Sequence, residues 1–346
     1  MSIFVPSFTI TNSISRTLSR IDQAKGFLDA ATLSESWLNQ MRQRALILEA
    51  HHTTHIEGTH LTLEQSEKLL SGKKLQNIDP EDERELRNYI RAFDYVEQHV
   101  EDNTSITEDM VLEIHRRLVK GVRGGKASPG KYRLTQNYII NSLTGEIVYT
   151  PPSPESVPGM TRNLIEWLNS GIDIHPVLIS GVAQFQLVHI HPFSDGNGRT
   201  SRLLSTVCLY RAGYDFKKLF TISQFYDRDR QAFYRALQNV RESGMDLTDW
   251  LEYFTSGLSV QMIEVADRGR IAIRIELISV KHNLSRRQRL LVEFLLEHST
   301  MNVQNAEAIC TGVNRRTLQR DLAELIDKGI ITKEGSTNQL FYMLDE

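Results

Sequence analysis

The stretch HPFSDGNGRTSR, residues 191–202, decides both the fold and the chemistry of this chain. An apolar pattern with helical spacing ends near Ile190, and a second helical pattern begins near Gly198. Gly196 and Gly198 allow the backbone between the two helices to turn its N–H groups into one concavity, toward which the second helix presents its positive end. Such a turn binds anions, and phosphate groups most naturally. The stretch therefore predicts a phosphate site between two helices.

Four side chains of this stretch add chemistry to the concavity. Arg199 and Arg202 lie three residues apart, so they share a face of the second helix and both can reach an anion. Asp195 is a hard oxygen ligand suited to Mg²⁺ on a di- or triphosphate. His191 stands at the entrance of the loop and has the reference pKa of a general base near neutrality. Together they predict transfer of a phosphorus group to a hydroxyl.

Composition and charge narrow the class of protein. Hydrophobic residues make up 40% of the 346 residues and charged residues 24%, which is typical of a globular protein. The net charge of -3 excludes a global attraction to nucleic acid or to an anionic membrane. Two cysteines, Cys208 and Cys310, exclude a disulfide framework and fit a reducing cytoplasm. We find no apolar stretch near 18 residues and no export signal, so we expect a cytoplasmic protein without membrane contact.

Helical patterns on both sides of the stretch predict a mainly α fold. The exception is NYIINSLTGEIVYTPP, residues 137–152, whose β-branched and aromatic residues around Thr144 and Gly145 predict a hairpin. We expect four parts, namely an N-terminal helical region at 1–105, a catalytic core at 106–255, a linker helix at 256–283 and a small domain at 284–346.

The small C-terminal domain reads as three helices followed by two short strands around Gly335, which resembles a winged helix-turn-helix. Its third helix begins Asn314-Arg315-Arg316 and continues to Arg320, as a DNA-reading helix does. However, this domain contains eight basic and nine acidic residues, and such a balance of charge does not by itself indicate a DNA-binding surface. Contact with DNA and contact with protein, including a homodimer, both stay open.

The stretch at 191–202 also resembles a known family. HPFSDGNGRTSR matches the Fic signature HPFxDGNGRxxR at all nine fixed positions, and the wider resemblance runs from about Leu112 to Phe254, with PGKYR at 129–133. The resemblance implies a Fic-type helical bundle with a β-hairpin flap. It also implies a protein adenylyltransferase, which moves AMP from ATP onto a Tyr, Thr or Ser hydroxyl of a protein or of itself.

The resemblance assigns a role to each residue of the signature. His191 would deprotonate the target hydroxyl, which attacks the α-phosphorus of ATP, and Asp195 would hold Mg²⁺ between the α- and β-phosphates. The hairpin at about 138–150 would align a target segment by strand addition. The remaining residues bind the nucleotide: Gly196, Asn197 and Gly198 form the anion loop, with Asn197 near the α-phosphate, and Arg199 and Arg202 neutralise the outer phosphates.

A second motif precedes the catalytic core. Residues 53–58, TTHIEG, fit the family's inhibitory pattern [S/T]xxxE[G/N]. In relatives with this arrangement the glutamate pairs with the second arginine of the signature, which is Arg202 here. The pair would occupy the space of the γ-phosphate and leave ATP misaligned. Glu57 is therefore the expected internal brake.

Two other functions stay open. The same pocket could remove AMP by hydrolysis, with Glu57 positioning a water molecule. Alternatively, the chain could be a DNA-binding regulator whose Fic-like part senses a nucleotide. A zinc site built from His189 and His191 is not expected, because residues two apart do not share a helix face.

Overall fold

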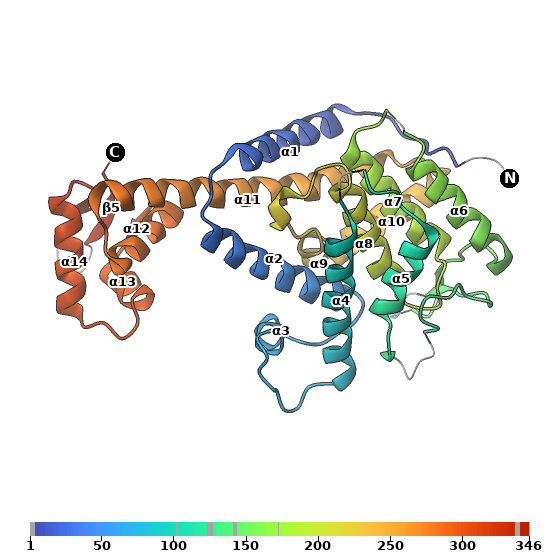
Figure 1. The fold of residues 1–346 in the computed structure, drawn as a ribbon, viewed down its shortest axis with the longest axis horizontal. Helices are drawn as coiled ribbons and strands as arrows, with labels where there is room; N and C mark the ends of the chain where they lie inside the picture. The colour runs from blue at the N-terminus through green and yellow to red at the C-terminus, as the bar shows by residue number, and fades with distance from the viewer. Residues whose placement is uncertain are drawn as a thin grey trace. The chain divides into compact units, whose positions relative to one another are not determined.

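The computed structural model describes residues 4–101, 103–122, 127–140, 144–171, 173–335 and 340–345, and it confirms the mainly α fold. Its described residues divide into two compact units (Figure 1). The first contains Met1–Asp29 and Leu38–Ile263, and the second contains Ala30–Trp37 and Glu264–Glu346. The finer division into four parts stays a prediction.

Helices build nearly all of the first unit. In chain order the elements up to the unit boundary are α1 (Asn12–Ala30), α2 (Glu35–Ile56), α3 (Leu63–Leu70), α4 (Pro80–His99), α5 (Glu108–Leu118), β1 (Ile139–Ile140), β2 (Ile147–Tyr149), η2 (Pro154–Ser156), α6 (Val157–Leu168), α7 (Pro176–Ile190), α8 (Asn197–Tyr210), η3 (Phe216–Lys218), α9 (Ser223–Arg228), α10 (Arg230–Glu242) and α11 (Thr248–His282). The boundary between the units falls within α11.

Helices α7 and α8 pack against each other at the centre of this unit, with α4 and α5 also against α8. Leu203, Val207 and Tyr210 of α8 are buried. The helix is buried all round, including the guanidinium-bearing Arg199 and Arg202. Buried charges require partners, so the surroundings of α8 must supply them.

The predicted hairpin is present as a short antiparallel pair. Ile139 lies opposite Tyr149 and Ile140 opposite Ile147. Gly145 takes a left-handed conformation with φ 74°, as a tight turn at Thr144 and Gly145 requires, while residues 141–143 lie outside the described residues. The side chains of Ile140 and Ile147 are more than half exposed. The hairpin thus presents apolar side chains and a strand edge to its surroundings.

The second unit contains the three predicted helices and one strand more than predicted. Its elements are α12 (Arg286–His298), β3 (Thr300–Met301), α13 (Val303–Ile309), α14 (Arg315–Asp327), β4 (Ile331–Glu334) and β5 (Phe341–Leu344). The strands form an antiparallel sheet in the order β3-β5-β4. A strand of two residues such as β3 is too short to show an alternation of apolar and polar residues, so its pattern does not predict it. Leu291, Leu318 and Leu322 lie in one apolar core.

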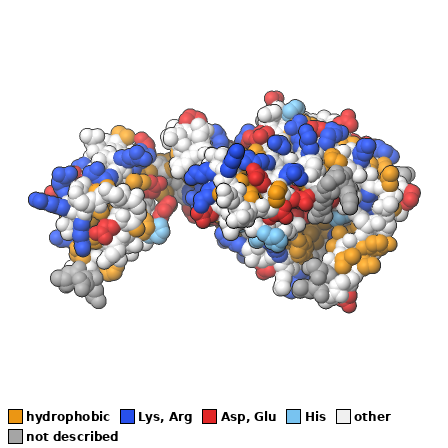
Figure 2. Space-filling view, turned by 90° about the horizontal axis from the view of Figure 1, so that it is seen from below, with side chains coloured by type: hydrophobic (Ala, Val, Ile, Leu, Met, Phe, Trp, Pro, Cys, Tyr) orange, Lys and Arg blue, Asp and Glu red, His pale blue; other side chains and the backbone are white. Residues whose placement is uncertain are grey.

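The surface carries both signs of charge. Figure 2 shows Lys and Arg side chains interspersed with Asp and Glu on the visible face, as the net charge of -3 leads one to expect. In the part of the chain that the structure describes, no helix combines the length and the apolar character needed to cross a membrane.

Candidate active site

The turn between α7 and α8 is bracketed by two left-handed residues. His191 ends α7 with φ 51° and ψ 57°, and Gly196 precedes α8 with φ 76°. A Cβ atom at Gly196 would lie 2.7 Å from Cγ1 of Val119, so the close approach of α5 also requires glycine. A left-handed non-glycine residue is held there only by its surroundings, and such residues concentrate at functional sites. His191 therefore lies at the start of a turn whose backbone conformation is held by its surroundings.

Hydrogen bonds to the backbone fix the shape of this turn. The Asn197 amide accepts a bond from Phe193 N at 2.9 Å and donates one to Phe193 O at 2.8 Å. Arg133 donates from Nε to the carbonyl of His191 at 2.8 Å, and its own N–H donates to the carbonyl of Pro192 at 3.0 Å. Arg133 is a residue that the sequence placed in PGKYR without a role. Asn197, expected near the α-phosphate, has its side chain engaged within the turn.

The imidazole of His191 is oriented by the end of α7. Its Nδ1 lies 3.3 Å from the carbonyl of Val188, so Nδ1 is the nitrogen that carries the proton when it donates this bond. Nε2 is then left with a lone pair. Burial lowers the pKa of His191 to about 4, so the ring is neutral at pH 7. A neutral ring with an accepting Nε2 is the form that a general base needs.

The Asp195 carboxylate lies beside the turn with 15% of its side chain exposed. Oδ1 accepts a bond from Gly196 N at 2.8 Å and lies 3.7 Å from a terminal nitrogen of Arg199. Among the described residues no group of three or more His, Cys, Asp or Glu side chains could hold a metal ion. One reachable carboxylate suits Mg²⁺, which takes its other ligands from phosphate oxygens and water. The residues present therefore fit the expected ion.

Both arginines of the stretch have carboxylate partners. Arg199 donates from one terminal nitrogen to Glu85 of α4 at 2.5 Å. Arg202 donates from Nε to the Thr53 hydroxyl at 2.7 Å and from a terminal nitrogen to the Thr53 carbonyl at 3.0 Å. The same terminal nitrogen lies 2.7 Å from Oε1 of Glu57. The structure thus brings together the two motifs at 53–58 and 191–202.

The carboxylate of Glu57 contacts the first turn of α8. The first intrahelical bond there runs from Thr200 N to Gly196 O, so the preceding N–H groups have no partner within the helix. A Cβ atom built on Gly198 would lie 2.2 Å from Oε1 of Glu57. Burial raises the pKa of Glu57, but Arg202 and Arg199 outweigh it and the net pKa is lowered. An ionised carboxylate therefore occupies the positive end of α8, where an anion would bind.

Comparison with known proteins agrees with this geometry. Residues 105–209 match the family model described as Fic/DOC family. Residues 105–209 are a Fic domain. The turn at 191–202 lies within this domain, whereas Glu57 lies N-terminal to it.

The relatives include proteins named Protein adenylyltransferase Fic. The one from Drosophila mojavensis is 31% identical over 279 residues, which are 75% of this chain and 53% of that protein, and the one from Drosophila grimshawi is 30% identical over 75% and 55%. The chain therefore spans about half the length of these curated relatives.

Solved structures share the fold. A Fic family protein from Desulfovibrio desulfuricans G20 superposes with a TM-score of 0.67 at 22% identity, over 99% of this chain and 98% of that one. Fic-1 from C. elegans superposes with a TM-score of 0.61 at 26% identity, over 76% and 73%. The helical bundle around the Fic domain is therefore a Fic fold.

The end of α2, which carries Glu57 toward the Fic domain, is held by one carboxylate that the sequence did not reveal. Asp227 of α9 lies 2.8 Å from Nδ1 of both His52 and His55, and 2.7 Å from Nε of Arg230. Burial raises the pKa of Asp227, but these three hydrogen bonds outweigh it and lower the pKa to about 2. The run HHTTH at 51–55 was the available signal, although it does not identify the acidic partner.

His189, the neighbour of His191 in the Fic domain, has a structural partner. Its Nδ1 lies 2.8 Å from the hydroxyl of Tyr149 on the hairpin. Burial lowers the pKa of His189 to about 4. The hydroxyl contact joins α7 to β2.

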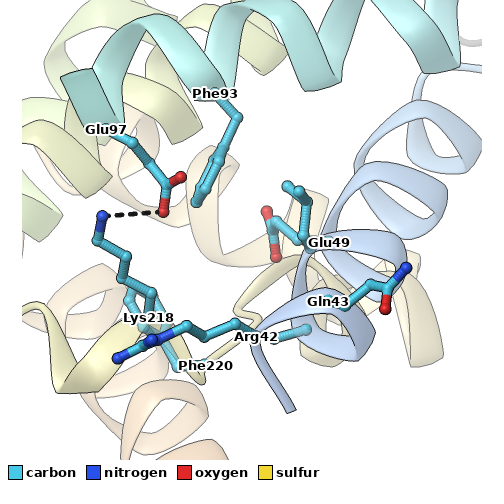
Figure 3. A pocket seen from close by; sticks show the side chains of 9 residues that line it. Arg42, Gln43, Glu49, Phe93, Glu97, Lys218 and Phe220 are labelled. Atoms are coloured by element: carbon cyan, nitrogen blue, oxygen red, sulfur yellow. Dashed lines mark ion pairs between the residues drawn. The ribbon is translucent and has the colours of Figure 1, made fainter. Parts of the chain in front are cut away.

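A cavity of about 430 Å³ lies beside α2 (Figure 3). Glu49 points into it opposite the ion pair between Lys218 and Glu97, which are 3.2 Å apart. Glu49 accepts a hydrogen bond from Ser223 N at 3.0 Å, and burial raises its pKa. None of the predicted site residues lines this cavity, whose lining consists of Arg42, Gln43, Ala45, Leu46, Glu49, Phe93, Glu97, Lys218 and Phe220.

Proposed function

We propose that this chain is a protein adenylyltransferase that restrains itself through Glu57. The observation that carries the proposal is the neutral imidazole of His191 beside a turn whose positive helix end holds an anionic group, the Glu57 carboxylate. The names of the Drosophila relatives support the same activity. The substrates are ATP and a protein hydroxyl.

In the proposed reaction Nε2 of His191 removes the proton from a Tyr, Thr or Ser hydroxyl. The hydroxyl oxygen then attacks the α-phosphorus of ATP, a new P–O bond forms, and the bond to the β-phosphate breaks to release pyrophosphate. Asp195 would hold Mg²⁺, which neutralises charge on the phosphates when bound. The amides at the start of α8 and the guanidinium of Arg202 bind the negative phosphates. The protonated imidazole returns its proton to water.

The hairpin of the Fic domain supports the choice of a protein as the second substrate. Its strands are two and three residues long, with Ile140 and Ile147 more than half exposed. A short exposed edge accepts an extended segment by strand addition, in which main-chain bonds align the segment and side-chain pockets select it. The hydroxyl would then be presented at the turn.

Glu57 acts as the brake in this proposal. Its carboxylate pairs with Arg202 and lies against Gly198, so a triphosphate could reach the same place only by displacing it. Two anions do not share one positive site, because their repulsion and desolvation both oppose it. Nucleotide bound beside Glu57 would be misaligned for attack.

The test is the intact mass of the Glu57→Gly protein after incubation with ATP and Mg²⁺. We expect a gain equal to AMP that exceeds the gain of the wild type. Glu83→Gln, which removes a partly exposed acid paired with Arg87 on α4, is the matched control and should behave as the wild type. A gain equal to phosphate, or no gain in any variant, refutes adenylyl transfer. Loss of AMP from already modified protein indicates the hydrolytic alternative.

We propose that the second unit has a separate role, in which it contacts DNA as a winged helix. The observation behind this choice is the first half of α14, where Arg315, Arg316, Gln319 and Arg320 are exposed. The N-terminal half of such a helix contacts base edges and phosphates. Binding to duplex DNA that weakens steeply with salt, and that is lost in Arg316→Ala, supports the role. Binding that ignores both changes contradicts it.

A further inference from the structure

His115 of α5 connects two segments that are far apart in the sequence. Its ring is completely buried and stacks on Phe193, with ring centroids 3.6 Å apart and planes 4° from parallel. Nδ1 lies 3.0 Å from Gly130 N, and Nε2 lies 3.0 Å from the carbonyl of Asp195. The imidazole therefore bridges the loop after α5 and the turn before α8.

The partners of His115 determine its tautomer. A backbone N–H can only donate, so Gly130 requires an unprotonated Nδ1. A carbonyl oxygen can only accept, so Asp195 requires the proton on Nε2. The neutral ring with the proton on Nε2 satisfies both partners at once, and no other form does.

The bond to the Asp195 carbonyl reaches the carboxylate of the same residue through the backbone. The peptide between residues 195 and 196 is planar, so fixing its C=O also fixes the direction of the Gly196 N–H. That N–H donates to Oδ1 of Asp195 at 2.8 Å. Gly196 itself packs against the ring, because a Cβ atom there would lie 3.5 Å from Cδ2 of His115.

We infer that His115 is a positioning residue, which sets the direction of the Asp195 carboxylate through the 195–196 peptide. This inference rests on the proposed function, since it concerns the carboxylate expected to hold Mg²⁺. It predicts that only the donating nitrogen of the ring matters for the metal. The accepting nitrogen secures the loop at Gly130 and contributes to stability.

Two substitutions separate the two nitrogens. In His115→Gln the side-chain amide reaches about as far as Nε2 and keeps the bond to Asp195, whereas in His115→Asn it reaches only as far as Nδ1 and keeps the bond to Gly130. Both are made in the Glu57→Gly background and compared by calorimetric titration with ATP at several Mg²⁺ concentrations. Tyr132→Leu is the control, because Tyr132 stacks on Phe193 at 5.8 Å without touching either bond of His115.

We expect the Mg²⁺ concentration that gives half-maximal ATP binding to stay within about threefold in His115→Gln and Tyr132→Leu, and to rise about tenfold or more in His115→Asn. Unfolding temperatures of all variants show that the comparison is made on folded protein. Equal Mg²⁺ requirements in the Gln and Asn variants overturn the inference while leaving the proposed function intact. Absence of Mg²⁺-dependent ATP binding in the parent protein overturns both.

Discussion

The turn at 191–198 and the brake at 53–58 face each other, yet they are held in different ways. In the turn, the bonds from Asn197 to Phe193 and from His115 to Asp195 join neutral side chains to backbone groups. The brake is held by opposite charges, above all Glu57 on Arg202. Neutral bonds to the backbone preserve one geometry, whereas an ion pair can be exchanged for another anion. In the function that we propose, this difference would allow the turn to keep its geometry while Glu57 regulates access to it.

The cost of leaving a buried charge unpaired supports the exchange of Glu57 for another anion. Removal of one partner from a buried ion pair costs about 3–5 kcal/mol, because the other charge stays buried and unpaired. Arg202 is 2% exposed, so loss of its anionic partner is unfavourable. A triphosphate supplies charge of the same sign as Glu57. The exchange of one anion for the other is therefore far less costly than loss of the pair.

The largest effect on the rate of AMP transfer is expected from a substitution in the turn at 191–198. His191→Ala in the Glu57→Gly background should lower the rate of AMP transfer about 10²–10⁴-fold, because the general base is lost. ATP binding, measured by titration, should change little since the turn keeps its own hydrogen bonds. A rate close to that of the parent would remove His191 from the mechanism.

This comparison also shows what the sequence could predict. The spacing of glycines and charges in 191–202 was enough to predict the turn, and the pattern at 53–58 was enough to propose Glu57. The sequence did not predict that Asn197 serves the turn itself, or that Arg199 is paired with Glu85. These contacts join helices that are distant in the chain, and periodicity describes each helix alone.

Residues without a local signal were missed altogether. His115 lies in an ordinary amphipathic helix, and one apolar-facing histidine resembles any core residue. Asp227 lies within a short helix, α9, that the sequence pattern did not reveal. Both become informative only when the tertiary structure brings their partners to them, because hydrogen-bond partners are chosen by position in space.

A second, smaller effect tests how closely the brake lies on the turn. Gly198→Ala places a Cβ atom where Oε1 of Glu57 lies, so in the wild type it should lower the free energy of unfolding by about 1–3 kcal/mol. In the Glu57→Gly background the contact with Glu57 is gone and only a terminal nitrogen of Arg202, at 3.2 Å, stays close. That guanidinium no longer pairs with Glu57 and can shift, so alanine should stabilise the helix by up to about 1 kcal/mol.

Urea denaturation of the four proteins gives the coupling between positions 57 and 198. The change of sign is the decisive result, because it requires direct contact between the two residues. An equal loss of stability in both backgrounds would mean that Gly198 is needed for the turn alone and that the Glu57 carboxylate lies elsewhere.

The smallest effect concerns the support of the brake. Asp227→Asn removes the charge shared by His52, His55 and Arg230, so the end of α2 should loosen and self-modification should rise a few-fold, less than in Glu57→Gly. The folded-state pKa of Asp227, about 2, is below its ordinary value. Its contribution to stability is therefore complete above about pH 4 and is lost as the pH falls toward 2.

Asp29→Asn is the matched control for this substitution, because it removes an exposed acid paired with Lys25 on α1, far from Glu57 in the sequence. Self-modification is followed with labelled ATP at pH 7, and acid unfolding is followed from pH 5 to pH 2. The difference in stability between Asp227→Asn and the wild type should shrink as the pH approaches 2, since the wild-type carboxylate then becomes protonated. Unchanged self-modification in Asp227→Asn would show that Arg202 alone positions Glu57, and that the charge cluster around Asp227 only joins α2 to α9.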